Sequence, residues 1–220
     1  MISDNYFEIK VILIGASAVG KTSFCNRIRG DNYQDTQLST IGVDFHLITL
    51  NVNKQCYHLQ IWDTAGHERY KSITTAYYRG ADIALLCFDL TNRKSLIDLM
   101  FWVTEIKEAT GNETVLFLIG MKSDLESIFM MDEIEQFMIE YDVLSYTKLS
   151  SKTTDSNFHD ILKNIVAKFC HEMDERKFAN KHNNYDNNTN ANTNTNTNNN
   201  IEPFIPNELD SQIKNCCYFS

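Results

Sequence analysis

One short segment limits the possible folds of this chain more than any other. It runs from Gly15 to Thr22 with the sequence GASAVGKT, follows the apolar run IKVILIG at 9–15, and fits the pattern G-x-x-x-x-G-K-[ST]. Glycines in such a loop let backbone N–H groups surround phosphate oxygens, and the N-terminus of the next helix adds positive potential. Lys21 is expected to reach the outer phosphates, and Thr22 to offer its hydroxyl to magnesium. The strand before this segment and the amphipathic helix after it favour a phosphate-binding loop over an ordinary glycine turn.

Short apolar runs rich in β-branched residues alternate with helical patterns along the chain. The predicted strands are 9–15, 43–50, 56–63, 82–90, 113–120 and 142–150. The predicted helices lie near 20–29, 69–79, 93–110, 132–140 and 155–176. The turn-rich link NVNKQ suits a hairpin between the second and third strands, and the other strands suit parallel crossovers. The predicted fold class is α/β, with a six-stranded mixed sheet, one antiparallel edge pair and about five helices on both faces.

Composition narrows the class of protein. Lys and Arg total 20 against 29 Asp and Glu, so the net charge of −9 argues against a nucleic-acid partner. The six cysteines lack the paired spacings of a zinc site or a disulfide framework, which suits a reducing compartment. The sequence shows neither a signal peptide nor an apolar run long enough to span a bilayer, so any membrane attachment is expected to be chemical.

Two further motifs follow the fifth and sixth strands, at the sheet edge where parallel α/β sheets bind ligands. They are MKSD at 121–124 and SSK at 150–152. They resemble the guanine-specificity motifs N-K-x-D and S-A-K of small GTPases of the Ras superfamily, which implies the P-loop GTPase fold. The carboxylate of Asp124 would accept hydrogen bonds from N1–H and the 2-amino group of guanine, which adenine lacks. Such a site typically discriminates by about 10⁴ to 10⁵, so GTP and GDP are the expected ligands.

The resemblance implies the remaining contacts with the nucleotide. The aliphatic stems of Lys122 and Lys152 would flank the base, the backbone N–H of Ser151 would meet O6, and Tyr33 would stack edge-on near the base. The expected nucleotide contacts are Ser17, Ala18, Val19, Gly20, Lys21, Thr22, Ser23, Tyr33, Thr40, Gly66, Met121, Lys122, Asp124, Ser150, Ser151 and Lys152.

Met121 departs from the family pattern, which has asparagine at this position. That asparagine bonds the base and ties its loop to the phosphate loop. Losing its side-chain hydrogen bonds would cost about 1 to 3 kcal/mol, so we expect weakened nucleotide retention and fast GDP release.

The segments STIGVDF and DTAGHER correspond to the two nucleotide switches of the family. The expected magnesium contacts are Thr22, Thr40 and Asp63, and Gly66 would give a backbone N–H to the γ-phosphate. When the γ-phosphate leaves, both loops would lose their anchors and relax. His67 stands where the family has the glutamine that orients the attacking water. A rigid imidazole is expected to place water poorly, so intrinsic hydrolysis should be slow.

Five segments sharpen the resemblance to the Rab GTPases, over about residues 8–176: IGVDF, HLQIW, RYKSIT, YYRGA and LLCFDLT. Phe45, Trp62 and Tyr77 match the aromatic triad that Rab effectors contact in the GTP state, and Ile41 is expected to join them. The alternative is that these aromatic residues are ordinary core residues.

The end of the chain suggests lipid attachment. The segment 183–200 contains 11 Asn and 4 Thr in 18 positions, so we expect it to be disordered. Cys216 and Cys217 resemble the C-C-x-x-x ending that Rabs carry for double geranylgeranylation, although CYFS would also pass as a farnesylation box. The expected organisation is a GTPase domain at 1–176, a disordered linker at 177–215 and a prenylation motif at 216–220.

The leading hypothesis is a monomeric Rab-like switch in vesicle trafficking that binds GTP and magnesium and hydrolyses GTP slowly. Its expected partners are an exchange factor, a GTPase-activating protein, Rab escort or GDP-dissociation-inhibitor proteins, and effectors. Its expected location is the cytoplasmic face of intracellular membranes, in exchange with the cytosol. The alternative is a hydrolysis-deficient scaffold that binds nucleotide and recruits effectors without useful turnover.

Overall fold

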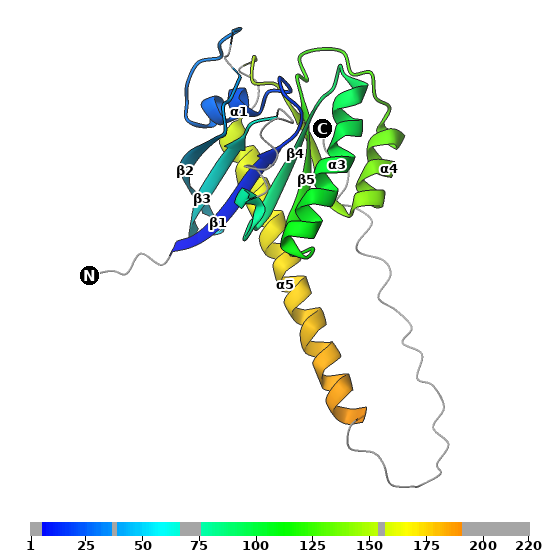
Figure 1. Cartoon of the computed structure of the whole chain (residues 1–220). Helices are drawn as coiled ribbons and strands as arrows, with labels where there is room; N and C mark the ends of the chain where they lie inside the picture. The colour runs from blue at the N-terminus through cyan, green and yellow to red at the C-terminus, as the bar shows by residue number, and fades with distance from the viewer. Residues whose placement is uncertain (1–5, 37–38, 67–75, 154–156, 191–220) are drawn as a thin grey trace, which may run out of the picture. The chain divides into compact units, whose positions relative to one another are not determined.

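The chain forms one mixed β-sheet with helices on both of its faces (Figure 1). The computed structural model describes residues 6–36, 39–66, 76–153 and 157–190, with side chains through residue 179. Its strands are β1 (Tyr6–Ile14), β2 (Val43–Val52), β3 (Gln55–Thr64), β4 (Ile83–Asp89), β5 (Val115–Met121) and β6 (Val143–Leu149). Its helices are α1 (Lys21–Ile28), α3 (Arg93–Thr110), α4 (Met131–Tyr141) and α5 (Phe158–Asn190). The strand order is β2-β3-β1-β4-β5-β6, and only the β2–β3 pair is antiparallel, so the predicted fold is confirmed.

The predicted hairpin forms at one edge of the sheet. β2 and β3 pair in one continuous register from Val43 opposite Thr64 to Val52 opposite Gln55. The two residues between them, Asn53 and Lys54, have φ of 50° and 67°. A two-residue loop with both φ values positive matches the right-handed twist of the strands that it joins.

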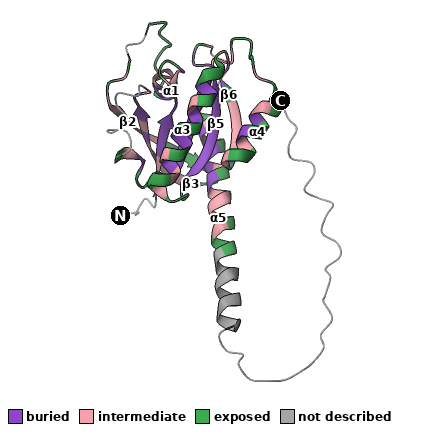
Figure 2. Ribbon diagram, turned by 45° about the vertical axis from the view of Figure 1, so that its right-hand side comes forward, coloured by how far each residue is buried: buried purple, intermediate pink, exposed green. Residues whose placement is uncertain are grey.

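The alternation of side chains along β1 builds two cores. Ile9, Val11 and Leu13 pack on the face covered by α1 and α5, whereas Ile12 and Ile14 pack on the face covered by α3 and α4. All seven residues of β4 and all seven of β5 are buried, as expected for parallel strands covered on both sides. Figure 2 shows β5 in the colour of buried residues, beside β6. The apolar runs of the sequence are therefore the centre of the sheet.

Helix α3 begins at residue 93, as predicted. Asn92 caps α3 by accepting a hydrogen bond from the backbone N–H of Lys94 at 3.1 Å. The predicted helix at 69–79 lies outside the described residues except for a helical turn at 76–78. None of the described helices combines the length and the apolar character needed to cross a membrane.

Helix α5 differs from its predicted end at residue 176. It continues to Asn190, so the first eight residues of the Asn- and Thr-rich segment 183–200 are helical in the structure. Helix propagation adds one hydrogen bond per residue without a new nucleation cost, so a long helix extends beyond its apolar stripe. The chain forms two compact units, Met1–Glu175 and Arg176–Ser220, and the boundary between them falls within this helix.

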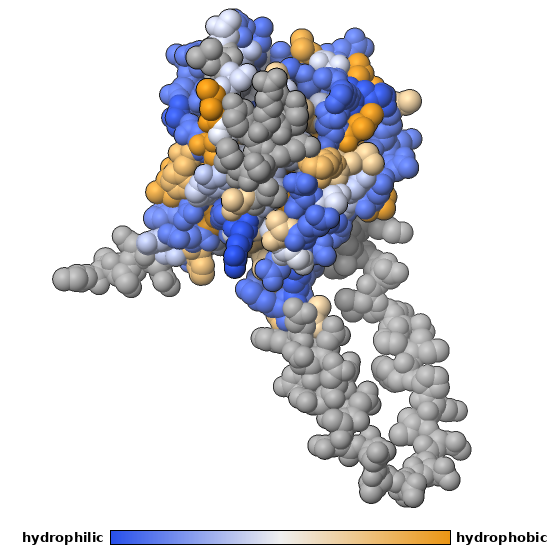
Figure 3. All heavy atoms as spheres, in the orientation of Figure 1, coloured by the Kyte–Doolittle hydropathy of each residue, from blue (hydrophilic) through white to orange (hydrophobic). Residues whose placement is uncertain are grey.

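The face of the described residues seen in Figure 3 is mostly hydrophilic, with hydrophobic residues gathered in places. One such group lies on and before β2, where Ile41, Phe45 and Leu47 are exposed. Another lies at the start of α4, where Met130 and Met131 are exposed.

Gly15 joins β1 to the phosphate loop, and its position excludes a side chain. A Cβ at Gly15, where φ is +147°, would lie 2.1 Å from the carbonyl oxygen of Cys87 on β4.

We expect Gly15→Ala to lower the free energy of unfolding by about 4 kcal/mol, from backbone strain and overpacking together. Chemical denaturation in the absence of nucleotide measures this change in the free energy of unfolding. Gly80→Ala is the control, because Gly80 has φ of +70° but open space around it, and it should cost only about 1 kcal/mol. Equal losses in the two variants would contradict the steric argument.

Candidate nucleotide-binding site

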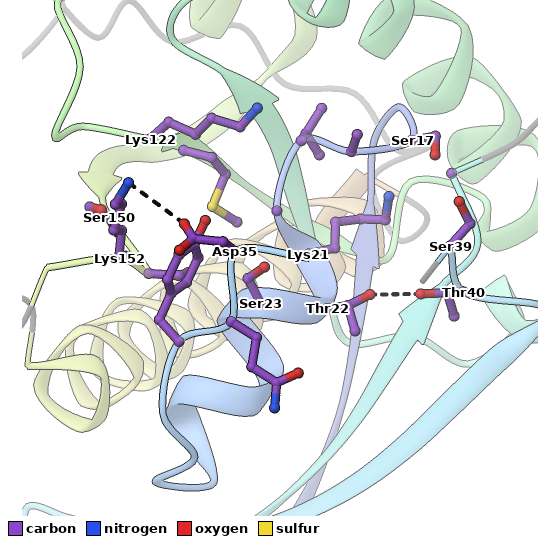
Figure 4. Close-up of a pocket in the computed structure, with 18 of the residues that line it drawn as sticks. Ser17, Lys21, Thr22, Ser23, Asp35, Ser39, Thr40, Lys122, Ser150 and Lys152 are labelled. Carbon is purple, nitrogen blue, oxygen red and sulfur yellow. Dashed lines mark hydrogen bonds and ion pairs between the residues drawn. The ribbon is translucent and has the colours of Figure 1, made fainter. Parts of the chain in front are cut away.

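The carboxyl ends of the parallel strands enclose a cavity of about 510 Å³ (Figure 4). Its walls come from the loop after β1, the segment before β2, and the loops after β3, β5 and β6. All sixteen residues expected to contact the nucleotide line this one cavity. Residues separated by more than a hundred positions in the sequence therefore meet in one site.

Lys21 holds the phosphate loop in shape. Its side chain is buried, and its Nζ donates hydrogen bonds to the carbonyl oxygens of Gly15 at 2.8 Å and Ala16 at 3.0 Å. Ala18 has φ of 64° and Gly20 has φ of 114°, so the loop turns tightly before α1 begins. Burial lowers the pKa of Lys21, and the negative charge of a phosphate would oppose that shift. The loop is suited to bind phosphates at the N-terminus of α1.

The three predicted magnesium contacts meet beside the phosphate loop. The Thr22 hydroxyl donates to Oδ2 of Asp63 at 2.5 Å. It also lies 2.7 Å from the Thr40 hydroxyl (Figure 4). Oδ1 of Asp63 is buried without a hydrogen-bond partner among the described residues. Burial also raises the pKa of Asp63. Two hydroxyls and an unpaired buried carboxylate oxygen fit Mg²⁺, which prefers oxygen ligands and keeps several waters.

Gly66 packs directly against the phosphate loop. A Cβ at Gly66 would lie 2.5 Å from the backbone carbon of Ala16 and from the backbone nitrogen of Ser17. The glycine therefore brings its backbone to the phosphate end of the cavity. His67, the other residue expected to act in hydrolysis, lies outside the described residues.

The opposite end of the cavity carries the residues expected to recognise guanine. The Ser150 hydroxyl donates to Oδ1 of Asp124 at 2.5 Å and accepts from the backbone N–H of Lys152 at 3.1 Å. Ser151 is buried in the same loop. This network fixes the Asp124 carboxylate at the end of the pocket.

Asp89 is a residue that the sequence analysis missed. It ends β4, and its Oδ2 accepts a hydrogen bond from Nζ of Lys122 at 2.5 Å. Its Oδ1 accepts from the backbone N–H of Thr91 at 2.9 Å and from the Thr91 hydroxyl at 2.7 Å. Burial favours a raised pKa for Asp89, but the hydrogen bonds from Lys122 and Thr91 outweigh it and lower the pKa. A charged Asp89 thus anchors the side chain of Lys122, which lies in the loop after β5 that is expected to contact guanine.

Asp35 was missed as well, because no local motif marks it. Its Oδ1 lies 3.7 Å from Nζ of Lys152, across the mouth of the cavity (Figure 4). Both side chains are more than half exposed, so the pair contributes little stability. Tyr33, two residues earlier, also lines the cavity.

Three of the four residues expected to contact effectors form a continuous aromatic group. The ring centroids of Phe45 and Trp62 lie 5.0 Å apart, and those of Trp62 and Tyr77 lie 5.2 Å apart. Phe45 is 47% exposed and Ile41 is 81% exposed, so neither is an ordinary core residue. Trp62 and Tyr77 are partly buried, and Trp62 packs against the core.

Comparison with known proteins matches most of the chain to one family. The Ras family model matches residues 10–171. The chain is 37% identical to the Ras-related protein Rab-13 of Mesocricetus auratus over 163 residues, covering 72% of this chain and 80% of that protein. It is 35% identical to human Rab-8B over 177 residues, covering 79% and 86%, and 37% identical to human Rab-3A over 176 residues, covering 79% and 80%. The chain belongs to the Rab GTPases of the Ras family.

Membership of the Rab family confirms the predicted ligands. This Rab GTPase binds GTP and GDP with Mg²⁺, hydrolyses GTP, and acts in vesicle trafficking. As a Rab it is served by exchange factors, GTPase-activating proteins and GDP-dissociation inhibitors, it binds effectors, and it works at intracellular membranes.

The Asp89–Lys122 contact predicts a measurable effect on nucleotide retention. Asp89→Asn removes a charge-assisted hydrogen bond worth about 1 to 2 kcal/mol, so GDP should dissociate roughly 5 to 30 times faster. Release of a fluorescent GDP measures the rate. Asp82→Asn is the matched control, because Asp82 accepts from the backbone N–H of Lys10 at 2.7 Å and does not line the cavity. If both variants release GDP at the native rate, Asp89 does not position Lys122 and the loop after β5.

Proposed function

We propose that this Rab is a membrane-trafficking switch that hydrolyses GTP slowly on its own and depends on an activating protein for useful turnover. The observation that carries the proposal is the arrangement of the cavity. Phosphate-binding residues line one end and the Asp124 carboxylate lies at the other, so a guanine nucleotide would span it.

The base end would select guanine. Asp124 would accept hydrogen bonds from N1–H and the 2-amino group, while the backbone N–H of Ser151 would donate to O6. The Ser150–Asp124 hydrogen bond of 2.5 Å supports this assignment, because it limits the rotation of the carboxylate. A fixed carboxylate discriminates better than a mobile one, since less conformational entropy is lost on binding.

The phosphate end would position the γ-phosphate for attack by water. Lys21 and the backbone N–H groups of residues 17–23 would neutralise and orient the phosphates, and the N–H of Gly66 would bond the γ-phosphate. Thr22, Thr40 and Asp63 would hold Mg²⁺, which when bound neutralises charge on the β- and γ-phosphate oxygens. His67 would have to orient the water. Its two ring nitrogens point apart on a rigid ring, so we expect poor placement and a slow intrinsic reaction.

Loss of the γ-phosphate would release the two switch segments. Thr40 and Gly66 would each lose a contact, and the exposed Ile41 and Phe45, with the partly buried Trp62 and Tyr77, follow or adjoin them. An effector that contacts this group would then distinguish the GTP state from the GDP state.

Membrane attachment completes the proposal. Cys216 and Cys217 lie outside the described residues, and we propose that both carry prenyl groups within the organisation 1–176, 177–215 and 216–220. One lipid chain gives only marginal attachment, and residues 177–220 contain three lysines against four acidic residues. Two prenyl groups therefore supply the second signal that a polybasic segment would otherwise provide, and the protein would cycle between membrane and cytosol as a monomer.

A second function is a scaffold that binds nucleotide and recruits effectors without useful turnover. His67 and Met121 favour it, since they replace the two family residues that position water and retain the base. Single-turnover GTP hydrolysis, with and without a Rab GTPase-activating protein, separates the two functions. Slow turnover alone that rises sharply with the activating protein supports the switch, and no turnover in either condition supports the scaffold.

His67→Gln tests where the catalytic amide comes from. The flexible amide of glutamine can orient water through both a donor and an acceptor. We therefore expect the intrinsic single-turnover rate to rise by about tenfold or more, equivalent to about 1.4 kcal/mol. With the activating protein present, the gain should be small, because such a protein can supply its own catalytic groups. An unchanged intrinsic rate would refute the role assigned to position 67.

Met121→Asn tests nucleotide retention. Restoring the amide should strengthen binding by about 1 to 3 kcal/mol, so GDP should leave roughly 5 to 150 times more slowly. Stopped-flow release of fluorescent GDP measures this difference. Equal release rates in the variant and the native chain would show that Met121 does not weaken retention.

A further inference from the structure

One wall of the guanine pocket has an apolar side chain in place of a hydrogen-bonding one. Met121, the last residue of β5, is 1% exposed and lines the cavity. Its side chain belongs to the buried apolar cluster on the α1 and α5 face, together with Val19 and Leu149. This wall of the pocket is therefore an extension of the hydrophobic core.

Two neighbours fix where Met121 lies. On one side it pairs with Leu149 of β6, the residue directly before Ser150 and Ser151. On the other side its Cβ would lie 3.9 Å from a Cβ built on Gly20, at the start of α1. Met121 thus lies between the loop expected to contact guanine O6 and the phosphate loop.

The ring of guanine places one atom at that point. Its N1–H and 2-amino donors lie on one side of O6, and N7, a second acceptor, lies on the other. If Asp124 accepts from the two donors and Ser151 donates to O6, N7 is the next polar atom toward the phosphate loop. A thioether is a weak acceptor and has no proton to donate, so Met121 offers N7 no hydrogen bond.

Two nearby side chains that can donate are already engaged. Nζ of Lys122 is bonded to Asp89 at 2.5 Å, and the Ser150 hydroxyl donates to Asp124 at 2.5 Å. Turning either of them toward N7 would weaken or break one of these contacts.

We propose that Met121 makes this Rab indifferent to N7, so that it accepts 7-deazaguanine nucleotides as readily as GTP and GDP. The inference rests on the proposed assignment of Asp124 and Ser151 to the base. In 7-deazaguanine a C–H group replaces N7, so the shape of the ring is kept and only the acceptor is lost. The specificity of the site would then rest on N1, the 2-amino group and O6 alone.

Equilibrium displacement of fluorescent GDP from the full chain in Mg²⁺ tests the inference, with GDP, 7-deaza-GDP and ADP as competitors. For the native chain we expect the dissociation constants of GDP and 7-deaza-GDP to agree within about twofold. Met121→Asn introduces an amide donor and should prefer GDP by about two- to tenfold, the value of one hydrogen bond. Met121→Leu, which is apolar and similar in size, should keep the native ratio.

The outcomes separate this inference from the proposed function. If GDP competes well and 7-deaza-GDP is about fivefold weaker or worse on the native chain, N7 is bonded and the inference is wrong. If the native ratio is near one and Met121→Asn shows no preference, Met121 does not face N7, which also overturns it. If ADP competes as well as GDP, or if GDP does not compete, the assignment of Asp124 falls and the proposed function falls with it. The native comparison needs no variant, so a much weaker 7-deaza-GDP would overturn the inference even if Met121→Asn does not fold.

Discussion

The buried ammonium group of Lys21 is the constraint on which the nucleotide site depends. A buried charge is costly unless it is hydrogen-bonded, and Lys21 meets that need with the carbonyl oxygens of Gly15 and Ala16. Those two carbonyls belong to the loop itself, so the loop must curl over the first turn of α1. Gly15 then lies against the Cys87 carbonyl of β4, and Gly66 lies against Ala16. The ends of β1, β3 and β4 are thereby held together before any ligand arrives.

The sequence predicted the parts of this structure that local patterns determine. The apolar runs gave the six strands because parallel strands buried on both faces need continuous apolar residues. The phosphate loop and the cavity residues followed from motifs with fixed spacing. Asp89 was not predicted, because its role depends on β4 lying beside β5, so that a strand end meets Lys122. Its position at the end of a buried strand was the one available signal, since polar residues there face the ligand edge of the sheet.

The end of α5 could not be predicted from the apolar pattern of the sequence. Apolar periodicity marks where a helix packs against a core, and it stops well before Asn190, where the helix ends. A backbone that is already helical continues without packing, so composition alone misplaced the boundary. The predictions for His67, for most of the helix at 69–79 and for the terminal cysteines concern residues outside the described part of the chain.

The register of β2 and β3 has a mechanical consequence. Thr40 lies just before β2 and Gly66 just after β3, and both strands reach the cavity at the same end of one hairpin. Ten consecutive pairs join the strands, and the backbone N–H of Ala65 donates to the carbonyl of Gly42 at 2.9 Å. The two switch segments are therefore attached to the same end of one rigid hairpin. A displacement of Thr40 or of Gly66 can reach the other residue through the hairpin backbone, without a rotamer change in the side chains between them.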